Sequence, residues 1–347
     1  MWCRFFILVA LISEVSGITL RHGLDAGMGA DLAERIDFAE VVQIEVGSAG
    51  GGGSSGSGVL LNSEWVLTAG HVVNAAGAGR MTISVNGTQR GVTDVFPNPG
   101  WVDDPAPGLG QGNDLMLLRL SEPISGAPVV PIWQGGGSGP LMGLMAGYGK
   151  GGNGLLGAYL SGGSLQAGLN VVDRFLSVGD GGFWVTDFDS GQVRHNTLNQ
   201  ATVDFRYFDI DGGDPLLSEA VFSILGNESL AGFNGLPTAA DFFPGLGEEF
   251  AEGTTSRGDS GGPLFLYSEE RARWELAGVT SFGVNPLYPA GFNRFDSRYG
   301  DLSFFADVSS QESWIKGVVI PEPSVVGFLV GALGLLWGRK RVRFSLN

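Results

Sequence analysis

The sequence predicts an all-β protein, a sandwich or a barrel, from its glycine content and its short apolar segments. Glycine accounts for 59 of the 347 residues, and 43% of the chain is hydrophobic. Collagen and wholesale disorder are excluded, because the glycines have no three-residue period and aliphatic and aromatic residues are plentiful. A mainly helical fold is disfavoured, since each interior glycine costs a helix about 1 kcal/mol. Short strands joined by many turns fit this composition.

The expected strands follow one another along the chain as apolar segments bounded by turn residues. They are Val41–Val46, Gly58–Leu61, Trp65–Thr68, Met81–Val85, Leu115–Leu120, Leu141–Tyr148, Trp184–Phe188, Pro263–Tyr267 and Trp274–Phe282. Three Gly-rich stretches, Ala49–Gly58, Gly135–Gly139 and Gly149–Gly157, are expected to be loops. One helix is expected over Val308–Lys316, which begins with capping serines.

The N-terminal residues 1–17 have the composition of a secretory signal peptide. Arg4 precedes the apolar stretch Phe5–Ile12, and small residues lead to a cleavage site after Gly17. The alternative is a buried N-terminal strand. Cleavage would remove Cys3, the single cysteine, so the mature chain would lack disulfides, a thiolate nucleophile and any cysteine-based metal site.

The C-terminal residues 319–347 have the features of a second targeting signal. Pro321-Glu322-Pro323 precedes the uncharged segment 325–337, which is followed by Arg339-Lys340-Arg341. This order resembles the PEP-CTERM sorting signal of Gram-negative bacteria. The resemblance implies export, transient insertion of 325–337 in the inner membrane, removal of the tail by an exosortase-type enzyme, and a final location at the cell surface or in the extracellular matrix. The alternative is an ordinary C-terminal anchor, although the segment is shorter than the roughly 20 residues of a stable span.

The charge of the chain argues against nucleic-acid partners. The formal net charge is −16, and removing both ends would make the remaining chain more acidic. Such a surface repels phosphate backbones.

A candidate nucleophile lies in Gly258-Asp259-Ser260-Gly261-Gly262-Pro263, just before an expected strand. Backbone amides in a glycine-rich turn can converge on one point, as an oxyanion hole requires. The letters also match G-x-S-x-G, the nucleophile elbow of α/β-hydrolases, but that fold needs a histidine after the serine, and none follows Ser260. A base must then come from His22, His71 or His195. His71 ends an apolar strand, and Asp114 stands at the start of another.

Three segments resemble, in chain order, the active-site motifs of the trypsin/chymotrypsin family of serine proteases. They are Thr68-Ala69-Gly70-His71, Asn113-Asp114-Leu115-Met116-Leu117-Leu118 and Gly258–Pro263. The resemblance implies two six-stranded antiparallel Greek-key β-barrels with a short C-terminal helix. The domain would span 36–318 after an N-terminal segment 18–35, with barrels at about 36–135 and 136–318 and insertions within 149–252.

The resemblance also implies the roles of the site residues. Ser260 would be the nucleophile, His71 the general base and then acid, and Asp114 the group that orients the imidazole, while the amides of Gly258 and Ser260 would form the oxyanion hole. Asp259 would pair with a new N-terminal ammonium, for which Ile18 and Ile36 are candidates.

Substrate-binding positions follow from the same resemblance. Thr254 stands where trypsin-type enzymes have an acid at the pocket base, so cleavage after Arg or Lys is not expected. Ser281 and Gly283 lie on the strand that would bind substrate, and Ser303 replaces a glycine of the pocket wall. A shallow pocket for small or medium uncharged side chains is expected. Val72 and Ser256 stand where family members usually have cysteines.

No cofactor or metal is expected for the reaction. The stretch Asp209-Ile210-Asp211-Gly212-Gly213-Asp214 has carboxylates that could ligate calcium, but it lacks the EF-hand pattern and also fits an acidic turn. His195 has no neighbouring ligand type and is interpreted as a surface residue.

The sequence therefore predicts an exported serine endopeptidase that acts on polypeptides through an acyl-enzyme. Two alternatives stay open: a non-catalytic matrix or adhesion protein on a protease scaffold, and an esterase that uses the same triad.

Overall fold

The computed structural model describes residues 17–25, 27–48, 53–73, 77–102, 112–135, 141–190, 197–198, 239–246, 251–284 and 295–319. The predicted signal peptide therefore lies almost wholly outside the described residues, as do segment 325–337, the stretch 209–214 and His195. Within the described part of the chain, no helix is long and apolar enough to cross a membrane.

The first barrel closes with six antiparallel strands in the order β2-β3-β4-β7-β6-β5. These are β2 (Val41–Gly47), β3 (Gly53–Leu60), β4 (Trp65–Thr68), β5 (Met81–Val85), β6 (Thr88–Pro97) and β7 (Met116–Leu120). Alternation places Ile44 and Ile83 in the core without exposed surface, while Glu45 faces outward. Two short helices accompany the strands, α2 (Gly70–Val73) and η1 (Ala78–Arg80).

Strand β3 corrects the prediction that Ala49–Gly58 is a loop throughout. Residues 53–58 pair with β2 in continuous register, from Gly47↔Gly53 to Val42↔Gly58. Pairing needs only main-chain donors and acceptors, and the glycines allow close approach: a Cβ placed on Gly58 would lie 3.0 Å from Val66 Cγ1. A strand built of glycine and serine has no apolar alternation and so was not detectable by that signal.

The second sheet has seven strands in the order β10-β8-β14-β15-β16-β12-β11. They are β8 (Leu141–Gly147), β10 (Gln166–Val172), β11 (Arg174–Val178), β12 (Gly181–Asp187), β14 (Pro263–Ser268), β15 (Arg273–Val284) and β16 (Leu302–Asp307). Strands β10 and β11 are separated only by Asp173, whose N–H donates to Val185 O at 3.0 Å. One bent strand thus pairs with β8 at one edge and with β12 at the other, which joins the two edges of the sheet.

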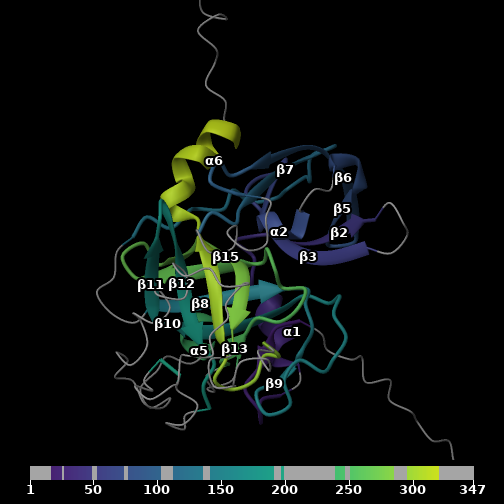
Figure 1. The fold of residues 1–347 in the computed structure, drawn as a ribbon. Helices are drawn as coiled ribbons and strands as arrows, with labels where there is room; N and C mark the ends of the chain where they lie inside the picture. The colour runs from purple at the N-terminus through teal and green to yellow at the C-terminus, as the bar shows by residue number, and fades with distance from the viewer. Residues whose placement is uncertain are drawn as a thin grey trace, which may run out of the picture. The chain divides into compact units, whose positions relative to one another are not determined.

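The all-β architecture with two barrel-like sheets is confirmed. Figure 1 shows the blue strands of the first barrel gathered apart from the teal and green strands of the second. The second core is aromatic: Phe282 stacks on Phe304 at 4.6 Å, and Phe183 meets both rings edge-on. A small helix, α5 (Ala239–Phe242), places Phe242 against Tyr267 and Trp274.

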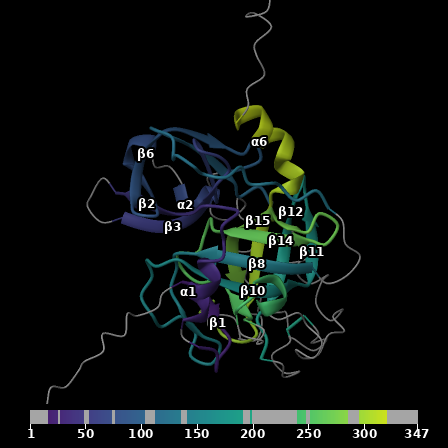
Figure 2. The same cartoon turned by 180° about the vertical axis from the view of Figure 1, so that it is seen from behind.

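The segment expected to precede the domain contributes to the fold. Strand β1 (Thr19–Leu20) pairs antiparallel with β13 (Gly253–Thr254) and parallel with β9 (Gly152–Asn153). Helix α1 (Met28–Ala33) buries Met28 and Leu32 and lies beside β10 (Figure 2). Residues 18–35 and the Gly-rich stretch 149–157 therefore carry secondary structure that their sequences did not predict.

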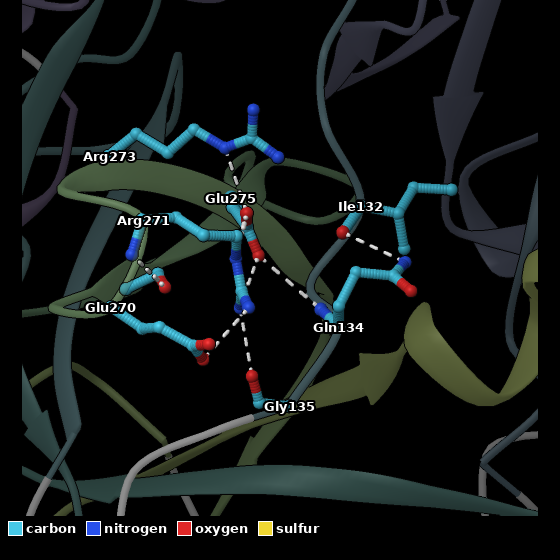
Figure 3. Close-up of polar contacts among 8 residues, drawn as sticks. Ile132, Gln134, Gly135, Glu270, Arg271, Arg273 and Glu275 are labelled. Atoms are coloured by element: carbon cyan, nitrogen blue, oxygen red, sulfur yellow. Dashed lines mark hydrogen bonds and ion pairs between the residues drawn. The ribbon is translucent and has the colours of Figure 1, made fainter.

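The segment between the barrels is fixed to β15. Trp133 N donates to Leu276 O, and Leu276 N donates to Pro131 O. Beside this pairing, the buried Glu275 carboxylate accepts from Arg271 Nε at 2.7 Å and from Arg273 Nε at 2.9 Å (Figure 3). Arg271 Nη2 also donates to Gly135 O at 2.8 Å. Burial favours a higher pKa for Glu275, but the two arginines outweigh it and the pKa is lowered.

The compact unit that contains both barrels ends at Ser310, and the following residues are described by themselves. The predicted helix over Val308–Lys316 is found as a turn of 3₁₀ helix, η5 (Ser309–Gln311), followed by α6 (Glu312–Val319). Within α6, Lys316 Nζ lies 2.8 Å from Glu312 Oε1, a favourable i, i+4 pair.

Candidate active site

His71 and Asp114 meet because the strands that carry them are neighbours. His71 follows β4 in helix α2, Asp114 precedes β7, and the two strands pair with Thr68 opposite Met116. His71 Nδ1 lies 2.7 Å from Asp114 Oδ2, and His71 N donates to Asp114 Oδ1 at 2.9 Å. A carboxylate can only accept, so Nδ1 carries the proton, and in the neutral ring Nε2 is left as an acceptor.

Ser281 supplies a further contact to the Asp114 carboxylate. It lies on β15 of the second barrel, and its Oγ donates to Asp114 Oδ2 at 2.6 Å. Asp114 has no exposed surface. The aspartate is therefore hydrogen-bonded by residues of both barrels. The Ser281 hydroxyl contacts Asp114, and the substrate-binding role of its strand stays a prediction.

The glycine before His71 is explained by Trp101. A Cβ placed on Gly70 would lie 2.7 Å from Trp101 Cδ2 and Cε2, so the indole packs directly on the backbone that carries His71. This contact was not predictable from the sequence, because Trp101 stands outside every predicted strand.

The turn around Ser260 leaves two amides without a hydrogen-bond partner among the described residues. Lys150 N donates to Arg257 O at 3.0 Å, and Gly262 N donates to Asp259 O at 2.7 Å. In a trans peptide the N–H points opposite to the C=O, so the N–H groups of Gly258 and Ser260 point away from these partners. Neither amide donates a hydrogen bond to any other residue that the structure describes. The φ of +101° at Gly258 is one that only glycine adopts without strain.

Main-chain contacts join this turn to the His71 side of the site. Ser57 N donates to Ser260 O at 2.8 Å. A Cβ placed on Gly56 would lie 3.0 Å from Ser260 O and 2.7 Å from Val72 Cγ1, and one on Gly261 would collide with Thr68 Oγ1. Only the backbone of strand β3 therefore lies between the turn that carries Ser260 and the helix that carries His71.

Asp259 is satisfied without a cation. Its carboxylate accepts from Gly149 N at 2.7 Å and from Ser256 N at 2.8 Å, and Ser256 Oγ lies 2.9 Å from Oδ2. No cationic group among the described residues pairs with it. Burial raises the pKa of Asp259 to about 6, although these hydrogen bonds oppose the shift. The ammonium expected as its partner would form only after cleavage before Ile18 or Ile36, so that pairing stays a prediction.

The predicted pocket residues lie in two groups. Ser303 Oγ is 2.9 Å from both Thr254 Oγ1 and Thr255 Oγ1, and all three side chains are buried. Gly283 is covered by the ring of Phe295, which a Cβ at position 283 would strike. The hydroxyl cluster carries no charge, and the Phe295 ring takes up space that the glycine leaves open. Thr255 and Phe295 were not predicted as pocket residues.

The remaining histidine of the described chain lies elsewhere. His22 Nδ1 is 2.6 Å from the Tyr299 hydroxyl, which also accepts from His22 N at 2.9 Å. His22 therefore serves the contact between the N-terminal segment and Tyr299. No group of three His, Cys, Asp or Glu side chains within the described ranges is arranged to hold a metal ion.

Comparison with known proteins gives one family and distant relatives. The trypsin family model matches residues 29–170, which include His71 and Asp114 but stop before Ser260. The chain is 24% identical over 245 residues to the complement C1s subcomponent of Sus scrofa, an alignment covering 65% of this chain and 28% of that protein. It is 33% identical over 112 residues to the complement C1s-1 subcomponent of Mus musculus, covering 27% of this chain and 16% of the relative. The chain thus spans less than a third of the length of the curated relatives it matches.

Proposed function

We propose that this chain, whose trypsin-family match and double-barrel fold support a trypsin-like serine protease, is an endopeptidase that cleaves polypeptides through Ser260, His71 and Asp114. The observation that carries the proposal is the His71–Asp114 pair, buried on its acidic side and connected through β3 to a serine turn with two available amides.

The chemistry would proceed through an acyl-enzyme. Ser260 Oγ attacks the scissile carbonyl while His71 Nε2 accepts its proton, and Asp114 stabilises the imidazolium that forms. The oxygen of the tetrahedral intermediate accepts hydrogen bonds from the amides of Gly258 and Ser260. His71 then protonates the leaving amine, and water, deprotonated by His71, releases the acyl group from Ser260.

The substrate would carry a small or medium uncharged side chain before the scissile bond. The hydroxyls of Thr254, Thr255 and Ser303 offer no charge to a basic side chain, and Phe295 narrows the space above Gly283. A peptide library should therefore yield cleavage after residues such as Ala, Val or Thr. Selective, efficient cleavage after Arg would contradict this preference.

The test uses the exported protein with a fluorophosphonate probe and casein. The wild type is expected to be labelled once per chain and to cleave casein, whereas Ser260→Ala should do neither. Ser256→Ala is a less suitable control because Ser256 contacts Asp259, so the exposed Ser55→Ala on β3 is used instead. A folded wild type that is neither labelled nor active would favour the non-catalytic alternative. Labelling with ester turnover but no peptide cleavage would favour the esterase.

We further propose that both ends of the chain are targeting signals. Residues 1–17 would direct export, and the PEP-CTERM-like tail would tether the protein transiently through 325–337 until an exosortase-type enzyme removes it. The mature protein would then reside at the cell surface or in the matrix. Mass spectrometry of the protein recovered from a host with this machinery should find an N-terminus near Ile18 and loss of the tail. Intact ends on the surface protein would refute the proposal.

A further inference from the structure

The hydroxyl of Ser57 stands between the two barrels at the nucleophile turn. Ser57 lies on β3 and has no exposed surface. Its Oγ accepts from Tyr148 N at 2.9 Å and donates to Gly258 O at 2.9 Å. Its main chain donates to Ser260 O and accepts from Thr68 Oγ1 at 2.7 Å. A single side chain thus connects the end of β8 with the turn that carries the candidate nucleophile.

The two peptide planes on either side of Gly258 are both held by hydrogen bonds. The plane before it is held through Arg257 O by Lys150 N. The plane after it is held at both ends, because Gly258 O accepts from Ser57 Oγ and Asp259 N donates to Ser256 O at 3.0 Å. Glycine has a wide choice of φ and ψ, so its conformation must be imposed from outside. Without the Ser57 hydroxyl, the plane after Gly258 would keep only the bond from Asp259 N to Ser256 O. This plane links the two planes that carry the N–H groups of Gly258 and Ser260, so their relative orientation would be less firmly fixed.

The hydroxyl cannot be replaced by other nearby groups without loss. Tyr148 N and Gly258 O would both be left half-buried and without their partner, which is unfavourable for backbone groups. A rotation of the peptide between Gly258 and Asp259 toward another donor would relieve that cost. It would also break the bond from Asp259 N to Ser256 O and change the angle between the two planes that carry the N–H groups of Gly258 and Ser260.

We propose that Ser57 is a positioning residue for catalysis: its hydroxyl holds the peptide between Gly258 and Asp259, which links the two peptides whose N–H groups, those of Gly258 and Ser260, would face the oxyanion. This inference rests on the proposed function. It assigns a catalytic consequence to a side chain that touches neither substrate nor the reacting atoms.

The test compares Ser57→Ala with wild type in the full exported chain. Turnover of a peptide substrate is normalised to active sites by burst titration, and a peptide aldehyde ending in alanine reports on oxyanion binding, since its adduct places an oxygen in the hole. Ser57→Ala should lower kcat and aldehyde affinity together by roughly tenfold or more, short of the 10²–10³ that removal of a whole oxyanion donor costs. KM should change by less than about twofold, because the ground state does not use these amides fully.

The matched control is Ser55→Ala, which removes an exposed hydroxyl from the same strand and should leave kcat and aldehyde affinity unchanged. If Ser57→Ala does not fold, Ser57→Cys provides the same comparison, because a thiol fills nearly the same space but is a weak donor and a weak acceptor. A lower Tm with unchanged kcat and aldehyde affinity per active site would overturn the inference and leave the proposed function intact. A wild type without any turnover or labelling would overturn both.

Discussion

The Asp114 carboxylate accepts hydrogen bonds from more groups than the His71 ring, its single predicted partner. It accepts from the His71 ring, the His71 backbone and the Ser281 hydroxyl, and it is fully buried. Every donor there is an N–H or O–H that needs an acceptor. The site therefore selects a group that accepts at both oxygens, which an aspartate does and an asparagine does not.

Asp114→Asn is accordingly expected to abolish most activity while the fold is retained. Its amide NH₂ must face one of the donors, and the His71 ring relieves the conflict by moving its proton to Nε2, where it can no longer act as a base. A loss of about 10⁴-fold in kcat is the magnitude known for this tautomer change in serine proteases. Steady-state kinetics against Asp94→Asn, a change at an exposed position of β6, measures the effect. Equal activity of the two variants would contradict the assignment of Asp114.

Phe295→Ala should widen substrate choice. Removing the ring uncovers Gly283, so cleavage after larger apolar residues such as Leu and Phe should gain relative to cleavage after Ala. Profiling with a peptide library measures the ratio. Phe175→Ala, which removes a half-exposed ring packed on Trp184 instead, should leave the ratio unchanged. An unaltered profile in Phe295→Ala would mean that the ring does not limit the pocket.

The site residues that the sequence predicted stand in local motifs, whereas those it missed act through contacts between segments far apart in the chain. His71, Asp114 and Ser260 stand in local motifs with strong flanks, so their spacing was sufficient to nominate them. Ser57 and Trp101 act through contacts across the barrels, and a buried serine in a glycine-rich stretch looks like any loop serine. Only the three-dimensional pairing of β3 with the Ser260 turn makes its hydroxyl informative.

At the level of elements, most apolar strands were predicted, but the buried strands β10, β11 and β16 were not, and neither were strands that depend on main-chain pairing. Trp65–Thr68 and Met81–Val85 have the predicted bounds because their side chains fill the core. Strand β6 was missed because it alternates weakly, as was most of β3 for its glycine content. The two-residue strands β1, β9 and β13 depend on one another, and no single segment among them has a strand signal.

The ion pairs of Glu275 with Arg271 and Arg273 should stabilise the segment between the barrels, because Arg271 also donates to Gly135 O. Glu275→Gln removes the charge that Arg271 and Arg273 share, and Tm at neutral pH should fall by a few degrees. The folded pKa is lowered, so this contribution is present above the unfolded value of about 4.3 and is lost as pH falls through the folded pKa. Thermal scans should therefore show the gap between variant and wild type closing at acidic pH. Glu122→Gln, at an exposed position, is the control. A gap that persists at low pH would mean that the loss is not electrostatic.

At the scale of the whole molecule, acidic side chains lie in the interior as well as on the surface. The chain has a net charge of −16, which destabilises the folded state by self-repulsion, and ionised carboxylates in the interior would destabilise it further. Burial raises the pKa of Asp259 to about 6 and of Asp301 to about 8, and it raises that of Glu252 well above the usual range. Asp189 and Asp187 add to the shift at Glu252 by repulsion. In the folded protein these carboxyl groups therefore bind protons more tightly than they do in the unfolded chain.

Stability should consequently increase as the pH falls from about 8.5 to about 5. A carboxyl whose folded pKa exceeds its unfolded value of about 4 binds a proton on folding in the interval between the two. Its contribution is complete below the unfolded pKa and is lost as pH rises through the folded pKa, near 6 for Asp259 and near 8 for Asp301. The Glu275 contribution, present above pH of about 4.3, does not oppose this trend within the interval.

Calorimetric scans across this range test the linkage, with Asp301→Asn as the diagnostic variant. The amide removes the proton that Asp301 binds on folding, so the Tm slope between pH 8 and pH 6 should become shallower, while the slope below pH 6 that Asp259 carries should remain. Asp94→Asn, at an exposed position, should leave both parts unchanged. A wild-type Tm that stays constant or falls on going from pH 8 to pH 5 would contradict the raised pKa values, because the buried acids would then be ionised in the folded protein.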